Sequence, residues 1–244
     1  VWMNYYKTGC WFQEVGANVR AKVSLVDAFD ADDVMFDGND TWGNNKKDKR
    51  AQFMTALPNQ VKDTWDVNMD MTSTFTCGYG YIKWRNVTKE DELSASGDAY
   101  TSIDFPLFRT ADAYLMAAEA ILRGASGTKS EALGYVNEVR TRAYMSGKYA
   151  KNGVRSDVSG EIGANELDLD FLLLERQKEL ASELIRRTDL IRFGKYTKGN
   201  NWDWKNGVRL GEDVDDKYNL FPIPESELTN NPTLVQNDGY KVIK

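Results

Sequence analysis

The acid–base chemistry open to this chain rests on carboxylates, because its 244 residues include no histidine and two cysteines. Catalysis by serine–histidine or cysteine–histidine pairs is therefore excluded, as are histidine-ligated and cysteine-rich metal sites. Glu175, Glu179 and Glu183 recur at steps of four, which places them on one face of a helix. A glycosidase needs two acids that flank its substrate, which neighbours on one helix face do not do. The spacing instead predicts a solvated or inter-helix salt-bridge face, with ion pairs to Arg176, Arg186 and Arg187.

Two other stretches resemble ligand sites without meeting their requirements. An acidic run could hold calcium through the oxygens of Asp30, Asp32, Asp33, Asp37, Asn39 and Asp40. Val34 and Met35 occupy ligand and glycine positions of a calcium loop, so the run predicts a turn with helix-capping aspartates and no metal. Residues 124–130 (GASGTKS) lack the Gly-Lys adjacency of a phosphate loop. We therefore expect no cofactor.

Aromatic residues interleaved with short polar ones form the composition expected of a sugar-binding site. An aromatic face stacks on the C–H face of a sugar ring, and amide, carboxylate and guanidinium groups pair with its hydroxyl rim. Residues 39–45, 65–66 and 79–86 have this composition. The predicted ligand-binding residues are Trp42, Asn44, Trp65, Asp66, Tyr79, Tyr81, Trp84 and Arg85. The alternative is that these rings pack the irregular half of the chain onto its helices.

Composition limits the other classes of function. The formal charge of −6 argues against binding to nucleic acid, which needs a basic surface. No apolar run approaches the roughly 18 residues of a membrane-spanning helix. Cys10 and Cys77 could form a disulfide or remain two buried thiols.

By composition and hydrophobic periodicity, the chain divides into a loop-rich region, 1–105, and a helical region with a proline-rich tail, 106–244. A first helix is predicted from 107 to 123, with a stripe formed by Phe108, Ala111, Leu115, Ala118 and Leu122. A second begins at Thr128, which forms a capping box with Glu131, and pairs with the first as an antiparallel hairpin. A third is predicted from Asp168 or Asp170 to Phe193, closed by Gly194.

Three strings in order carry a resemblance to a known family. They are residues 105–120 (FPLFRTADAYLMAAEA) with 136–143 (VNEVRTRA), then 175–181 (ERQKELA), then 220–224 (LFPIP). Together they resemble the C-terminal part of the SusD/RagB family. The resemblance covers residues from about 100 to 240 well and the first hundred loosely. Leu184 departs from the pattern, since the family usually has glycine there.

The resemblance implies a mainly α fold, a tetratricopeptide-like α/α superhelix with long loop-rich segments and little β structure. Such proteins are lipoproteins on the surface of the outer membrane, with a lipid anchor that is not present in this chain. They bind glycans, deliver them to a TonB-dependent SusC-like transporter, and are not enzymes. A peptide-binding relative and a helical-repeat scaffold for protein partners are the alternatives.

A further aromatic stretch, residues 200–207, contains Trp202 and Trp204. Its composition suits contact with a ligand or with the transporter. A loop held in place by its own tryptophans is an equally good interpretation.

Overall fold

The computed structural model describes residues 21–34, 46–54, 80–81, 83, 104–150 and 158–241. Two compact units make up the chain, Val1–Leu184 and Ile185–Lys244. In the first unit, short helices α1 (Val23–Val26) and α2 (Ala31–Val34) precede a two-residue antiparallel ladder of β1 (Phe53–Met54) and β2 (Gly80–Tyr81). Among the described residues, this ladder is the one β structure. The predicted division of the sequence at residue 105 stays a prediction.

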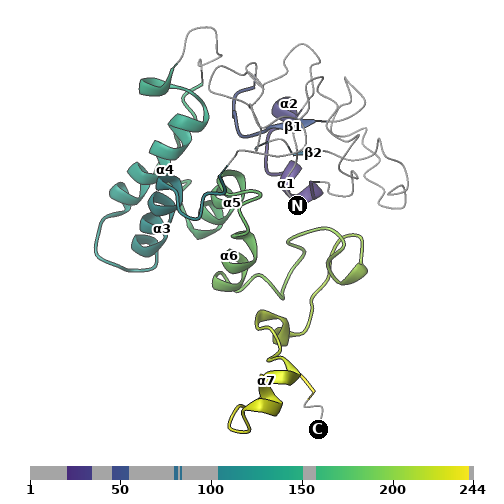
Figure 1. The fold of residues 1–244 in the computed structure, drawn as a ribbon. Coiled ribbons are helices and arrows are strands. Elements are labelled where there is room, and N and C mark those ends of the chain that lie inside the picture. The colour runs from purple at the N-terminus through teal and green to yellow at the C-terminus, as the bar shows by residue number, and fades with distance from the viewer. Residues whose placement is uncertain are drawn as a thin grey trace. The chain divides into compact units, whose positions relative to one another are not determined.

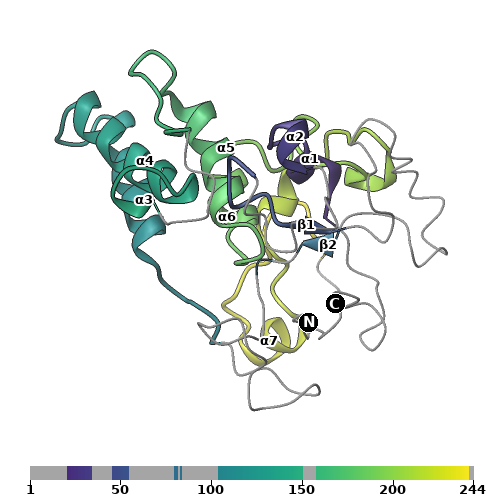
Figure 2. The same cartoon turned by 90° about the horizontal axis from the view of Figure 1, so that it is seen from above.

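The helical hairpin is the main element of the first unit. It consists of α3 (Thr110–Leu122) and α4 (Lys129–Ala143), which run side by side in both views (Figure 1, Figure 2). The predicted capping box is confirmed: the Glu131 amide donates to Thr128 Oγ1 at 3.2 Å, and the Thr128 amide donates to Glu131 Oε2 at 2.6 Å. This box satisfies amides that the first turn of α4 leaves unpaired.

The predicted start of the first helix was wrong by three residues. Arg109 has an extended backbone, with φ −136° and ψ 151°, so α3 begins at Thr110. Phe108 consequently falls outside the apolar stripe and is 89% exposed. The other predicted positions that the core needs, Leu115 and Ala118, are fully buried.

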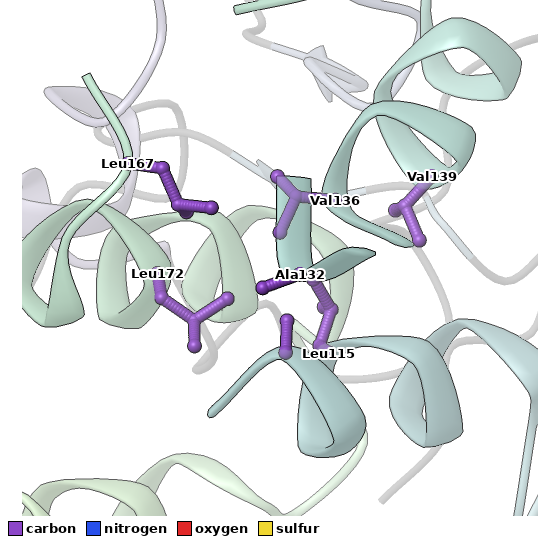
Figure 3. Close-up of a cluster of buried hydrophobic side chains, with 7 residues drawn as sticks. Leu115, Ala132, Val136, Val139, Leu167 and Leu172 are labelled. Carbon is purple, nitrogen blue, oxygen red and sulfur yellow. The ribbon is translucent and has the colours of Figure 1, made fainter. Parts of the chain in front are cut away.

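Helix α5 (Leu169–Glu179) packs against this hairpin and completes its core. Figure 3 shows leucine, valine and alanine side chains from α3, α4 and α5 converging with Leu167, which precedes α5. Burying each leucine or valine contributes about 1.5–3 kcal/mol. The cluster comprises Leu115, Ala118, Ala132, Val136, Val139, Leu167 and Leu172.

The predicted third helix is in fact two. Asp168 caps α5 as expected, because its Oδ1 accepts the Phe171 amide at 2.8 Å. The helix then ends at Glu179, and Ser182 and Leu184 both have φ of 62°. Left-handed backbone at these two positions interrupts the ladder of helical hydrogen bonds. Helix α6 (Arg186–Arg192) begins after the break, and Gly194, with φ 67°, follows it.

A second apolar cluster lies beneath the β ladder in the first unit. Phe29, Phe53 and Tyr81 form a run of ring contacts, with centroids 5.5 Å and 5.2 Å apart. Val26, Val34 and Ala51 complete this buried cluster. The loop-rich part of the chain therefore has a core of its own.

The second unit combines α6 with short turns and an extended tail. These are η4 (Lys205–Gly207), η5 (Asp216–Asn219) and α7 (Glu225–Asn230). The tail is held by Gln236, whose amide accepts the Ile223 N–H at 2.8 Å and donates to the Ile223 carbonyl at 2.9 Å. The predicted turn at Asn231 is confirmed by the Leu234 amide, which donates to the Asn231 carbonyl.

Candidate functional site

Tyr81 is the one predicted ligand-binding residue among those the structure describes. Its side chain is 6% exposed, its ring packs on Phe53, and its hydroxyl donates to the Arg50 carbonyl at 3.3 Å. Burial raises the pKa of this hydroxyl. Tyr81 therefore has the packing role, and its ring face is not open to a sugar. The other predicted residues lie outside the described part of the chain: Trp42, Asn44, Trp65, Asp66, Tyr79, Trp84 and Arg85.

The chain beside Trp84 is fixed through Lys83. The Lys83 ammonium donates to the Glu179 carbonyl at 2.7 Å and to the Ala181 carbonyl at 3.2 Å, and it pairs with the Glu183 carboxylate. Burial lowers the pKa of Lys83, while the Glu183 carboxylate opposes that shift. A half-buried cation with these partners anchors the chain after β2 to the end of α5.

The segment before β1 is anchored by Arg50. Its guanidinium forms a two-point pair with Asp48, with distances of 2.9 Å and 2.8 Å, and reaches Glu175 Oε1 at 2.6 Å. It also lies 3.3 Å from Glu179 Oε2. All four side chains are buried, so these pairs are screened little by solvent.

Three further arginines bind the same glutamates. Arg140 of α4 reaches Glu175 at 2.7 Å. Arg142 of α4 reaches Glu179 at 2.6 Å. Arg109, just before α3, reaches Glu179 at 2.8 Å and Glu183 at 2.7 Å. We call these side chains the buried charge network: Asp48, Arg50, Lys83, Arg109, Arg140, Arg142, Glu175, Glu179 and Glu183.

Ion pairing of the three glutamates was predicted, but its form differs. The glutamates are buried between elements, and their partners come from elsewhere in the chain. Arg176 instead pairs with Asp112 at 2.9 Å, and Arg187 donates to the Tyr218 carbonyl at 2.8 Å. The glutamates stabilise the fold because each is committed to a cation and to the packing around α5.

The network lowers the pKa values of two of its carboxylates, Glu179 and Asp48. Burial is the largest single influence and acts to raise both pKa values. For Glu179, the combined attraction of Arg50, Arg142 and Arg109 outweighs burial, and for Asp48 the charge and hydrogen bonds of Arg50 do so together with Lys178. Both carboxylates are therefore ionised at neutral pH.

The acidic run contributes a turn. Asp33 Oδ1 accepts the Lys47 amide at 2.6 Å, and Oδ2 accepts the Asp48 amide at 3.0 Å. The Lys46 ammonium donates to the Asp33 carbonyl. These bonds join the end of α2 to residues 46–48. Within the described ranges, no three acidic or cysteine side chains gather in a way that could hold a metal ion.

Trp202 belongs to a loop that is stabilised by contacts among its own residues. Its ring lies 5.5 Å from the Tyr196 ring, and the Lys205 ammonium lies 5.1 Å from it. Lys205 is buried and donates to the Gly199 carbonyl at 2.9 Å. A Cβ at Gly211 would lie 2.6 Å from the Trp202 carbonyl oxygen, so the loop closes tightly there. Both Trp202 and Trp204 are half-buried, which agrees with the self-anchored loop.

Sequence reasoning missed the arginines of the network. Arg50, Arg109, Arg140 and Arg142 are separated from their glutamates by 35 to 129 positions, and no short-range spacing reveals such pairs. One signal was available: Glu175 and Glu179 share a helix with the apolar run at 171–174, and a helix of this kind is buried. Buried carboxylates require cations.

Comparison with known proteins decides the family. The sequence model of the SusD family matches residues 2–240. The chain belongs to the SusD family. Among curated relatives, it is 38% identical over 176 residues to the starch-binding protein SusD of Bacteroides thetaiotaomicron, covering 72% of this chain and 28% of that protein. It is 30% identical to SusD-like protein P2 of Formosa agariphila, covering 77% of this chain and 41% of that protein.

A solved SusD-type structure supports the fold. The surface glycan-binding protein A of Bacteroides uniformis superposes with a TM-score of 0.50 at 20% identity, covering 89% of this chain and 40% of that one. The expected fold class, mainly α with a tetratricopeptide-like α/α superhelix, long loop-rich segments and little β structure, is confirmed. The chain spans less than half the length of these SusD relatives. Among the described residues, no helix is both long enough and apolar enough to span a membrane.

Proposed function

We propose that this SusD-family chain binds oligosaccharides or polysaccharides at the cell surface and delivers them to a TonB-dependent SusC-like transporter. The observation that carries the proposal is the family match along residues 2–240, together with a 38% identical relative named as a starch-binding protein. The protein would be an outer-membrane lipoprotein.

The proposed binding residues lie on chain segments whose ends are pinned. Residues 35–45, which include Trp42, connect the end of α2 to Lys46. Directly after Lys46, the backbone amides of Lys47 and Asp48 donate to the Asp33 carboxylate. Residues 55–79, which include Trp65, are closed by the β1–β2 ladder. Trp84 directly follows Lys83, which is bound to the end of α5. Fixing the ends of a segment reduces the entropy that ligand binding must overcome.

Affinity gels and isothermal titration with a polysaccharide panel that includes starch test this site. We expect Trp42→Ala, Trp65→Ala and Trp84→Ala to weaken binding, because each stacked ring contributes about 0.5–1.5 kcal/mol beyond its buried area. Phe108→Ala is the matched control, since it removes an exposed ring of the same unit that is outside the predicted site. Wild-type affinity in all three tryptophan variants would reject the site assignment. Binding of peptides and no glycan would favour a peptide-binding SusD-like protein.

The second part of the proposal is that the protein binds glycans and does not cleave them. The three glutamates of the α5 region are paired with cations inside the buried charge network, which supports a structural role for them. Incubation with each bound glycan should release no shorter product. The appearance of new reducing ends, lost in a Glu175→Gln variant, would contradict this.

The transporter partnership is tested in native membranes. A tagged form of the complete protein should co-purify with a TonB-dependent barrel from detergent-solubilised outer membranes. Surface labelling of intact cells should reach the protein. Recovery of the protein alone, from the periplasm, would contradict both the partner and the location.

A further inference from the structure

A cavity of about 300 Å³ opens in the first unit. It lies where the start of α3 faces the last turns of α4 and the short helix η3 (Gly147–Tyr149). Its lining combines two guanidiniums, a carboxylate and two tyrosine rings with small side chains. The lining residues are Arg109, Thr110, Ala111, Tyr114, Glu138, Val139, Arg142 and Tyr149.

The buried charge network reaches this cavity through Arg109 and Arg142. Both guanidiniums contact the same carboxylate, Glu179, which is also shared by Arg50. Arg142 is the most exposed member, with 41% of its side chain open. Its Nη2 donates to Glu179, whereas its Nε and Nη1 have no hydrogen-bond partner among the described residues. These donors are available to an anion in the cavity.

Glu138 supplies acceptors on the same wall of α4. Its Oε1 accepts the Tyr149 hydroxyl at 2.6 Å and lies 2.5 Å from the Lys148 ammonium. Hydrogen bonds from Lys148 and Tyr149 lower the pKa of Glu138, so the carboxylate is ionised at neutral pH. Oε2 is left to accept hydrogen bonds from hydroxyl groups.

Aromatic faces complete the lining. Tyr149 is held in place by its bond to Glu138, and Tyr114 is held by stacking on Tyr135, with centroids 5.6 Å apart and planes at 17°. Both rings are half-buried. A ring fixed in this way can stack on the C–H face of a sugar without losing further side-chain freedom.

We propose that this cavity is a second ligand site that takes a single hexuronic acid unit. The sugar carboxylate pairs with the Arg142 guanidinium, the hydroxyls bond to Glu138, and one ring face lies on tyrosine. A guanidinium forms charge-assisted hydrogen bonds with a carboxylate, which a neutral sugar cannot reproduce. The volume is at the lower end of ligand pockets and suits one sugar ring more than an oligosaccharide.

The site extends the proposed glycan binding but does not depend on the loop tryptophans. Isothermal titration and NMR titration of the full chain use methyl α-galacturonide, methyl α-galactoside and sodium acetate as probes. We expect the galacturonide to bind about tenfold more tightly than the other two probes, because a charge-assisted pair and a stacked ring act together. Arg142→Gln should weaken galacturonide binding about tenfold, and Arg142→Lys should restore part of it.

Arg123→Gln is the matched control, because Arg123 is 38% exposed, pairs with Glu119 at 2.8 Å and does not line the cavity. It should bind galacturonide as the wild type does. Absence of galacturonide binding, equal affinity for galactoside or acetate, or unchanged affinity in Arg142→Gln overturns the inference. Thermal unfolding of each variant shows that it is folded.

The two proposals fail separately. Galacturonide binding should persist in Trp42→Ala, Trp65→Ala and Trp84→Ala, while polysaccharide binding through those residues should persist in Arg142→Gln. Loss of galacturonide binding in the tryptophan variants would show that the ligand binds at the tryptophans and not in this cavity, and it would overturn the inference.

Discussion

Arg50 and Glu175 lie 125 positions apart in the sequence, yet Arg50 Nη1 is 2.6 Å from Glu175 Oε1 in the interior of the first unit. This contact ties the segment before β1 to the middle of α5. The same guanidinium holds Asp48, so the polar groups of the turn at 48–50 are satisfied within the fold. A buried charge of this kind is stable only while its partners remain.

Removal of the Arg50 charge should therefore destabilise the protein strongly. We expect Arg50→Met to lower the free energy of unfolding by about 3–5 kcal/mol, because Asp48 and Glu175 would be left buried with fewer cations. Urea unfolding followed by circular dichroism measures the change. Lys198→Met, which breaks an exposed pair with Asp216, should lower it by less than about 1 kcal/mol. Similar losses in both variants would contradict the role given to the buried charge network.

Acid should weaken the fold through Glu179 and Asp48. Burial acts to raise their pKa values, but the cations around them together outweigh it, so both pKa values are lowered in the folded state. Carboxylates of this kind stabilise the fold fully above their unfolded pKa values, and the stabilisation is lost as the pH falls through the folded values. We expect the free energy of unfolding to decrease below about pH 5, by about 1.4 kcal/mol per pH unit for each proton taken up.

Urea unfolding at intervals between about pH 7 and about pH 3 tests this dependence. Glu179→Gln removes one of the titrating groups, so its stability should depend less steeply on pH than that of the wild type. The same slope in both proteins would show that Glu179 does not contribute.

Leu184 is a position where glycine should be better. It has φ of 62° and is 78% exposed, so it bears left-handed strain while burying little apolar surface. We expect Leu184→Gly to raise the free energy of unfolding by about 1 kcal/mol, because relief of strain exceeds the entropy that glycine adds to the unfolded chain. Leu174→Gly, inside α5, should lower it by at least about 1 kcal/mol. Destabilisation of both variants would contradict the strain at Leu184.

Two glycines of the first unit should respond in opposite directions to alanine. Gly160 has φ of 71°, and a Cβ there would lie 2.4 Å from Cδ2 of Tyr144, whose ring is covered by Arg140. We expect Gly160→Ala to destabilise the protein by about 1–3 kcal/mol. Gly134 is exposed within α4 with open space around it, so Gly134→Ala should stabilise by about 1 kcal/mol. Thermal unfolding of the pair measures both effects.

Local signals in the sequence were sufficient where structure depends on neighbours in the chain. The Thr128–Glu131 capping box and the Asp168 cap were both predicted, because a cap needs residues three positions apart. The apolar stripe through Leu115 and Ala118 was predicted for the same reason.

The sequence was misleading where backbone geometry departs from residue preference. Leu180 and Leu184 continue the leucine spacing of α5, which predicts one long helix, yet the chain turns through left-handed residues that are not glycine. Phe108 fits the spacing of α3 but precedes its first residue. The fold, and the resemblance to its family, were nevertheless predictable, because they rest on several motifs in order.

The charged interior was beyond prediction for a different reason. The spacing of Glu175, Glu179 and Glu183 on one helix predicts ion pairs, but it does not say whether the partners are four or 129 positions away. That choice depends on how α4, β1 and the segment before α3 pack around α5. Of the predicted sugar-binding residues, the buried Tyr81 illustrates the same limit, since alternation of aromatic and polar residues describes both a stacking platform and a core.

Residues 35–45 and 55–79 are held at their ends, so the groups that fix these segments are different from the residues that the segments contain. Asp33 and the β1–β2 ladder hold the points where the chain departs and returns, and neither uses a side chain from inside the segments. We expect substitutions between those points to leave these bonds in place. In the site that we propose, a lineage could therefore change its nutrient by rewriting two short stretches of gene, while the helices that carry them stay under the old constraints.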